Sequence, residues 1–426
     1  MWPAIVHGKG LQRQRSEPKP LGAKPCHNER VMSFASGTIS FRRYVVTGKH
    51  PKQVDQDLLD KLVAHVLQAP EFGVPEDVEY GWCGGRHIFD STFSFEHNVL
   101  GDAAHFALRI DTNRVPSELK RAYQLMEEDA TAAGNPSGFI SKNQKRDVKD
   151  VVRRKLDEDL RSGKFRRSKL IPILWDFATQ TLYTPASVAA MEKLHELFER
   201  TFELTLEPLT AGSIALRYVE GKARRREYED MRPTRFVPGP EGEGQYPDYP
   251  WVAKGPQPKD FLGNEFLLWL WHESELRRGV IQTEAAGEVA VLLDRSLELD
   301  CAYGQSGKDS LRADGPTRMP EARDALRSGK LPRRAGLVLE SGGKQFQLTL
   351  NCETLGCAGV KLPDVEEAED ARVVFEERIA MLRDLSQTID SLFHAFLRTR
   401  AGAAWEGQTT SIRRWILQTS KQAVVA

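Results

Sequence analysis

The spacing of apolar residues in the N-terminal half predicts strands that alternate with amphipathic helices. Strictly alternating apolar residues indicate a half-buried strand, and apolar residues at steps of three and four indicate a helix with one buried face. A proline that follows a polar stretch marks the start of the second helix. The expected order is strand, helix, two strands and helix, over 38–46, 54–67, 88–95, 104–111 and 116–130.

The same reading continues to residue 400. The segment from Ser141 to Leu170 is expected to hold a helix with a narrow apolar stripe. Its stripe consists of Val148, Val151, Val152, Leu156 and Leu160. Further strands are expected at 170–175, 180–184, 202–206, 289–293, 297–303, 337–339 and 345–350, and further helices at 185–200, 261–275 and 375–396. This order of elements predicts an α+β fold of several lobes, elongated, with mixed sheets and flanking helices.

Shifts in composition predict where these lobes begin and end. Residues 1–32 are rich in Gly, Pro, Lys and Arg and are expected to be a disordered arm before an alternative start at Met32. Seven prolines between Pro233 and Pro258 indicate an irregular connection. The expected parts are the arm at 1–32, an N-terminal lobe at 33–220 with a basic helix at 142–169, the connection at 221–260, a C-terminal lobe at 261–400 with a projecting finger at 304–334, and a tail at 401–426.

Charge changes this picture because it is balanced overall but segregated along the chain. The sequence has 60 Lys and Arg and 60 Asp and Glu. Segment 142–169 nevertheless carries twelve basic and five acidic residues, and segment 308–334 carries eight basic and four acidic ones. Two positive segments on a neutral chain are typical of a surface that binds a polyanion. A solvated face without any ligand gives the same pattern.

Cysteines and hydropathy limit the class of protein. The five cysteines, at 26, 83, 301, 352 and 357, include no Cys-x-x-Cys pair, so neither a disulfide framework nor a four-thiolate zinc site is expected. The most apolar run, 261–271, is too short and too interrupted for a membrane span. We therefore expect a cytoplasmic protein without a membrane partner.

Candidate catalytic residues are few. The run Gly81 to Gly85 lacks the strand and helix context of a dinucleotide site, and there is no Walker sequence. Two groups of possible metal ligands are His87, Asp90, His97 and His105, and Asp90, Asp176 and Glu203. The first lacks the spacing of a helical zinc site, and nothing in the pattern brings the second together. We expect no enzyme activity, no cofactor and no metal, with a metal-dependent nuclease as the alternative.

The order of several motifs resembles the RdgC family of bacterial recombination-associated DNA-binding proteins. The resemblance covers about Ser33 to Arg400. It includes Gly81-Trp82, a Lys-x-x-Lys-x-Asp-x-x-Lys-Asp pattern in 142–151, and the Trp175-Asp176 hairpin. Further points are Arg114 to Ser117 before a helix, Glu321 to Lys330 before a Leu-rich hairpin, and the helix from Phe375 to Phe396. The chain departs from the family in its arm, its Pro-rich connection and its tail.

The resemblance implies a ring-shaped homodimer with a finger, which encloses double-stranded DNA without reading sequence. It also implies association with the nucleoid and modulation of RecA-dependent homologous recombination, with RecA as a further partner. The basic segments supply the expected DNA-binding residues: Lys142, Lys145, Arg146, Lys149, Arg153, Arg154, Lys164, Arg166, Arg167, Lys308, Arg312 and Arg318. A scaffold protein without nucleic acid is the remaining alternative.

Overall fold

One antiparallel sheet runs through the described part of the chain, and it joins the two predicted lobes. The structure is a computed structural model that describes residues 34–68, 77–237, 259–301, 307–365 and 370–418. Ten of the 13 strands follow one another in the order β10-β9-β11-β12-β13-β1-β6-β5-β4-β2. The strands are β1 (Ile39–Thr47), β2 (Val78–Cys83), β3 (Val99–Leu100), β4 (Ala103–Asn113), β5 (Arg166–Asp176), β6 (Thr181–Thr184), β7 (Thr205–Pro208), β8 (Val280–Gln282), β9 (Glu288–Cys301), β10 (Asp309–Ala313), β11 (Lys330–Ser341), β12 (Lys344–Asn351) and β13 (Cys357–Lys361).

Helices pack on both faces of this sheet. They are α1 (Gln56–Ala64), α2 (Phe95–Asn98), α3 (Ser117–Ala133), α4 (Lys142–Arg161), α5 (Val188–Phe202), α6 (Ala211–Glu220), α7 (Arg225–Asp230), α8 (Phe261–Leu276), α9 (Pro320–Arg327), α10 (Ala371–Arg400) and α11 (Trp405–Leu417). The α+β class is thus confirmed. The predicted mixed sheets are wrong, because every pairing between named strands is antiparallel.

Strand β1 connects the two halves of the sheet. Its first residues, Ile39 and Phe41, pair with β13, and its residues Arg42 to Val45 pair with β6. The end of β1 also pairs with β7. Since side chains of a strand alternate between two faces, β1 contributes to two different cores. Phe41 is buried in the larger core, whereas Tyr44 and Val46 are buried in a second core beneath α1 and α5.

The 30-residue helix α10 crosses both halves of the sheet and is held by buried ion pairs. Arg43 of β1 is almost fully buried and donates two hydrogen bonds, of 2.6 and 2.7 Å, to the carboxylate of Asp390. Burial alone would lower the pKa of Arg43, but the charge and hydrogen bonds of Asp390 outweigh it and raise that pKa. Arg383 binds the buried Asp176 of β5 and also Asp102. These contacts fix α10 against the N-terminal strands.

Helix α8 is apolar on all sides because it lies inside the larger core. Phe266 and Trp269 pack against the rings of α10, with Phe266 and Phe393 centroids 5.1 Å apart. Gly263 is required here, since a Cβ at this position would lie 1.7 Å from the carbonyl oxygen of Cys352. None of the helices in the described residues is long and apolar enough to cross a bilayer.

The predicted finger at 304–334 does not form a separate lobe in its described part, 307–334. Strand β10 pairs with β9, and β11 begins at Lys330 and also pairs with β9. The apolar side of α9, formed by Ala322, Ala325 and Leu326, is buried in the larger core. The small helix uses that core to bury its apolar face, which local spacing does not reveal, and a projecting finger stays a prediction.

The predicted tail at 401–426 is also part of the core, in residues 401–418. Ile412, Trp415 and Ile416 of α11 are buried against α8 and α9. The guanidinium of Arg323 lies 3.9 Å from the centroid of the Trp415 ring, and it donates a hydrogen bond to the Trp415 carbonyl. The arm at 1–32 and the stretch 238–258 of the Pro-rich connection lie outside the described residues.

The strand predictions differ from the structure at several places, and β3, β8, β10 and β13 were not predicted. Residues 88–94 form no strand, and the strand beside β4 is β2, which was not predicted. The two strands expected at 289–293 and 297–303 are one strand, β9, with an irregular register and Arg295 at φ 66°. A bulge of this kind interrupts the alternation of side chains and so divides the sequence pattern.

His105 of β4 is buried among aromatic rings. It lies edge-on to Phe34 and Phe375, with ring centroids 6.3 and 4.7 Å away, and its Nε2 has no hydrogen-bond partner. Because no acceptor compensates a charge at this place, burial lowers the pKa of His105 to about 3. His105 is therefore neutral at physiological pH.

We predict that Asp390→Ala destabilises the protein by about 3 kcal/mol, because it leaves the charge of Arg43 buried without a partner. Asp384 on the same helix serves as control, since it binds Lys344 with both side chains more than 40% exposed. Asp384→Ala should cost less than about 1 kcal/mol. Urea unfolding followed by circular dichroism measures both. Equal losses of unfolding free energy in the two variants would contradict a larger contribution of the buried pair.

We predict that stability falls as the pH is lowered below about 6.5, in part through His105. The unfolded chain binds a proton near that pH, whereas the folded chain does so only near pH 3. This contribution is complete above pH 6.5 and is lost at up to about 1.4 kcal/mol per pH unit as the pH falls. His105→Phe should flatten the dependence of unfolding free energy on pH between 6.5 and 4.5, and His97→Gln at an exposed position should not. Parallel curves for wild type and His105→Phe would refute this.

Candidate nucleic-acid interface

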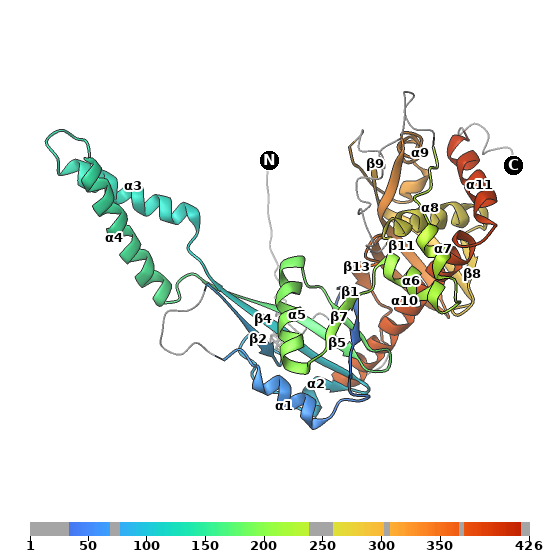
Figure 1. Cartoon of the computed structure of the whole chain (residues 1–426), viewed down its shortest axis with the longest axis horizontal. Helices are drawn as coiled ribbons and strands as arrows, with labels where there is room; N and C mark the ends of the chain where they lie inside the picture. Colours follow the sequence, from blue (N-terminus) through green and yellow to red (C-terminus); the bar gives the residue numbers. More distant parts are fainter. Residues whose placement is uncertain (1–33, 69–76, 238–258, 302–306, 366–369, 419–426) are drawn as a thin grey trace, which may run out of the picture. The chain divides into compact units, whose positions relative to one another are not determined.

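Two helices, α3 and α4, form a hairpin with a small core of its own. The hairpin is inserted between the paired strands β4 and β5 (Figure 1). Val148, Val152 and Leu156 of α4 are buried and pack against Val115 and Tyr123. Val151 was expected to belong to the buried stripe, but it is 38% exposed. The narrow core leaves most of the surface of α4 in contact with solvent.

Hydrogen bonds fix both ends of α4. Ser141 and Gln144 form a capping box, in which each side chain accepts a hydrogen bond from the backbone amide of the other residue. At the other end, the side-chain amide of Asn113 donates a 3.0 Å hydrogen bond to the carbonyl of Leu160. These bonds hold α4 at the end of β4, so its charged side chains project from a defined scaffold.

Five cations lie on one flank of α4, and we call them the basic row. At about 100° per residue, positions at steps of three, four and seven share one side of a helix. The basic row consists of Lys142, Lys145, Arg146, Lys149 and Arg153, all exposed. The acidic Asp147, Asp150, Asp157 and Glu158 fall on the other flank, where Arg154 also lies. Arg154 was expected to bind DNA together with these five cations, but the helix places it on the opposite flank.

The basic row has no acidic partner in the part of the chain that the structure describes, since none of its members forms an ion pair there. Lys155 lies closer to the small core and, unlike the basic row, has an acidic partner. Its ammonium lies 3.9 Å from the Glu127 carboxylate and 4.7 Å from the centroid of the Tyr123 ring. A row of uncompensated cations gives the surface a positive potential that attracts anions.

Arg166 was expected to bind DNA, but the structure places it in an ion network between strands. It donates hydrogen bonds of 3.0 Å to Asp111 and 2.7 Å to Glu79, and its side chain is only 16% exposed. Arg109 also binds Asp111. Burial alone would raise the pKa of Asp111, but hydrogen bonds from Arg109, Ser168 and Arg166 outweigh it and lower that pKa. Arg166 therefore holds strands together and is a poor candidate for a phosphate ligand.

Lys164 is bound locally, whereas Arg167 is free for a ligand. The ammonium of Lys164 lies 3.0 Å from Asp159 and donates a hydrogen bond to the hydroxyl of Tyr123. These contacts raise the pKa of Lys164. Arg167 is exposed, and it forms no ion pair with any described residue. The two neighbours in sequence, Arg166 and Arg167, differ because they lie on opposite faces of β5.

The second predicted group, Lys308, Arg312 and Arg318, lies elsewhere in the fold. These residues are exposed on or beside β10, at the opposite end of the strand order from β4. Lys308 is 3.6 Å from Asp300. Within one chain, the sheet thus separates this group from the basic row.

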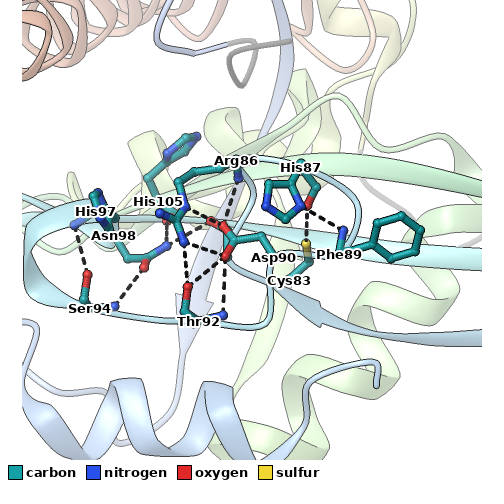
Figure 2. A network of polar contacts seen from close by, with 11 residues as sticks. Cys83, Arg86, His87, Phe89, Asp90, Thr92, Ser94, His97, Asn98 and His105 are labelled. Atoms are coloured by element: carbon teal, nitrogen blue, oxygen red, sulfur yellow. Dashed lines mark hydrogen bonds and ion pairs between the residues drawn. The ribbon is translucent and has the colours of Figure 1, made fainter. Parts of the chain in front are cut away.

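The histidines and Asp90 do not form a metal site. Figure 2 shows Arg86 and Thr92 directed at the Asp90 carboxylate, which accepts hydrogen bonds of 2.9 Å from both side chains. Burial would raise the pKa of Asp90, but these bonds outweigh it and hold that pKa well below its usual range. In residues with described positions, no group of three His, Cys, Asp or Glu side chains could hold a metal. The network instead fixes the turn between β2 and α2.

The ion network around Arg166 was not predicted, because it needs the register of three strands. Alternation along β4 puts Arg109 and Asp111 on one face, and this can be read from the sequence alone. The position of Glu79 opposite Asp111 follows only from the β2–β4 pairing.

Four cysteines in the described residues, Cys83, Cys301, Cys352 and Cys357, are free and buried. A free cysteine packs in a core as a small apolar side chain. Burial raises the pKa of Cys357 to about 12.

Comparisons of the sequence with known proteins gave no match. No model of a known protein family matches the chain, and no curated protein matches it. Membership of the RdgC family therefore stays a prediction that rests on the motifs quoted above.

Proposed function

We propose that the protein binds double-stranded DNA without reading its sequence, and that the basic row on α4 contacts the phosphates. The observation that carries this proposal is the row itself, with five exposed cations on one flank of a capped helix and no acidic partner among the described residues. Its charges do not serve the small core of the hairpin, which is formed by apolar residues on another side. They are available for a polyanion.

Contacts to phosphates fit this surface better than contacts to bases. Lys and Arg side chains neutralise phosphates and fix the position of a protein on DNA, but these contacts carry no sequence information. The basic row consists only of such residues. The side chains that read adenine by paired hydrogen bonds, Asn and Gln, occur on α4 only near its start, where Gln144 is engaged in the capping box. Binding should therefore be similar for unrelated sequences.

The proposal includes a two-fold homodimer that encloses the duplex, acts on the nucleoid and modulates RecA-dependent recombination. The resemblance to RdgC supports these points. Closed two-fold pairing would also place two basic rows around one axis and raise the potential between them. It offers a role for Lys308, Arg312 and Arg318 as well, which lie at the other end of the strand order from α4. In this proposal the protein acts by binding and carries no catalytic residue.

We predict that wild-type protein binds unrelated duplexes with similar affinity in the absence of magnesium and nucleotide. Five neutralised phosphates give a log–log salt slope of about −4 to −5. The variant Lys145→Ala, Lys149→Ala, Arg153→Ala should flatten this slope to about −2, because each lost contact removes about 0.9. Fluorescence anisotropy over a salt series measures both slopes, and light scattering of the same samples measures the dimer.

Matched controls separate the basic row from charge in general. Lys49, Lys52 and Arg200 are exposed, lie outside α3 and α4, and form no ion pair with described residues. Replacing all three with alanine removes the same charge and should leave the slope within about 1 of wild type. The single change Arg154→Ala on the acidic flank should also have little effect. A thousandfold preference for one sequence, a need for magnesium, or equal effects of the two triple variants would refute the proposal.

A further inference from the structure

The strands next to the α3–α4 hairpin present two rows of side chains on one face of the sheet. In the register of β2, β4 and β5, the first row is Val78, Thr112 and Arg167. The second row is Tyr80, Ile110 and Lys169. We call these six residues the strand platform.

The strand platform lies just beyond the core that α1 and α5 cover. The next row along the same strands, Trp82, Leu108 and Ile171, is buried in that core. In the strand platform, by contrast, Arg167 and Lys169 are exposed and the four other residues are half-buried. The sheet thus continues past the described helices that cover its core, and this face carries two exposed cations.

The two faces of this part of the sheet differ in their charge balance. On the opposite face, the cations Arg109 and Arg166 are matched by the carboxylates of Asp111 and Glu79. On the platform side, Arg167 and Lys169 have no ion-pair partner among the described residues. A third cation comes from α5, where the ammonium of Lys193 lies 5.0 Å from the centroid of the Tyr80 ring. The strands themselves contribute no carboxylate to this face.

We propose that the strand platform, with Lys193, is a second contact surface for the phosphodiester backbone of duplex DNA. This inference rests on the proposed function and extends it from α4 to the sheet. Arg167 and Lys169 are two residues apart on β5, which separates them by about 7 Å along the strand. Along the helix axis, one DNA strand rises by about 3.4 Å per nucleotide, so phosphates two nucleotides apart rise by about 7 Å and match the spacing of the two cations.

A polyanion explains the platform better than an apolar partner. Two of its six side chains are long cations in contact with solvent, and burying them against an apolar protein would cost free energy without compensation. An acidic protein segment would match the charge, and binding of such a segment in place of DNA is an outcome that would overturn the proposal. Because the cations lie on paired strands, their spacing does not depend on a flexible loop.

Lysine acetylation footprinting of the wild-type protein tests this surface directly. An amine-reactive acetyl donor would be applied with and without a 30-base-pair duplex, and modification would be read by mass spectrometry. We expect Lys169 and Lys193 to be protected at least threefold by the duplex, together with Lys145 and Lys149 of the basic row. Lys49 and Lys52 should react equally in both samples.

Each outcome of the footprint distinguishes the two proposals. Protection of Lys145 and Lys149 without protection of Lys169 and Lys193 would overturn the platform and leave the proposed function intact. Absence of duplex binding in the anisotropy assay would refute the proposed function, and the platform with it. Protection of the platform lysines by a poly-glutamate peptide but not by duplex would overturn the platform as a DNA contact.

A variant gives an independent measurement. With the platform engaged as well as the basic row, about eight neutralised phosphates give a wild-type slope near −7, steeper than the −4 to −5 of the basic row alone. Arg167→Gln, Lys169→Gln, Lys193→Gln should make this slope shallower by about 2 to 3, while the melting temperature stays within about 2 °C of wild type. The matching change Lys49→Gln, Lys52→Gln, Arg200→Gln is the control. A slope equal to that of the control would overturn the platform. If the variant fails to fold, the footprint of the wild-type protein still decides the matter.

Discussion

The fold depends on strand β1, which pairs with strands of both halves of a single sheet. It pairs with β13 at one end and with β6 and β7 along the rest of its length. Its buried Arg43 binds Asp390 of α10, and the same helix binds Asp176 of β5 through Arg383. A buried charge without its partner is costly, so these pairs allow only one placement of α10 across the sheet. The larger core is built around that placement.

This arrangement leaves the charges of the basic row on α4 without an ion pair to any described residue. Ion pairs that matter for the sheet use Arg43, Arg166 and Arg383, which are largely buried and have named carboxylate partners. The basic row lies on a hairpin whose apolar contacts are separate from both large cores. Its cations therefore repel one another without compensation from the described residues, and an anionic ligand would relieve that repulsion.

The contrast between Arg166 and Arg167 shows how charge is sorted at the strands beneath α4. Neighbouring residues on a strand point to opposite faces, so one guanidinium enters a balanced network and the other faces solvent. Net charge along the sequence counts both residues equally. The proposed binding surface therefore differs from the basic segment at 142–169. It excludes Arg154, Lys164 and Arg166 of that segment, and it includes Lys193 of α5.

The sequence by itself determined most elements with a clear local period. The helices α1, α3, α4, α5, α8 and α10 lie close to their expected ranges, since an amphipathic or fully apolar period is a local property. It also located the basic row, because the charges flank an apolar stripe on one helix. Only the tertiary structure decided that 307–334 and α11 belong to the larger core, that β2 lies beside β4, and that Arg166 is neutralised by Asp111 and Glu79. These features depend on partners far apart in the chain, and no local pattern specifies which distant surface an apolar face or a charge will meet.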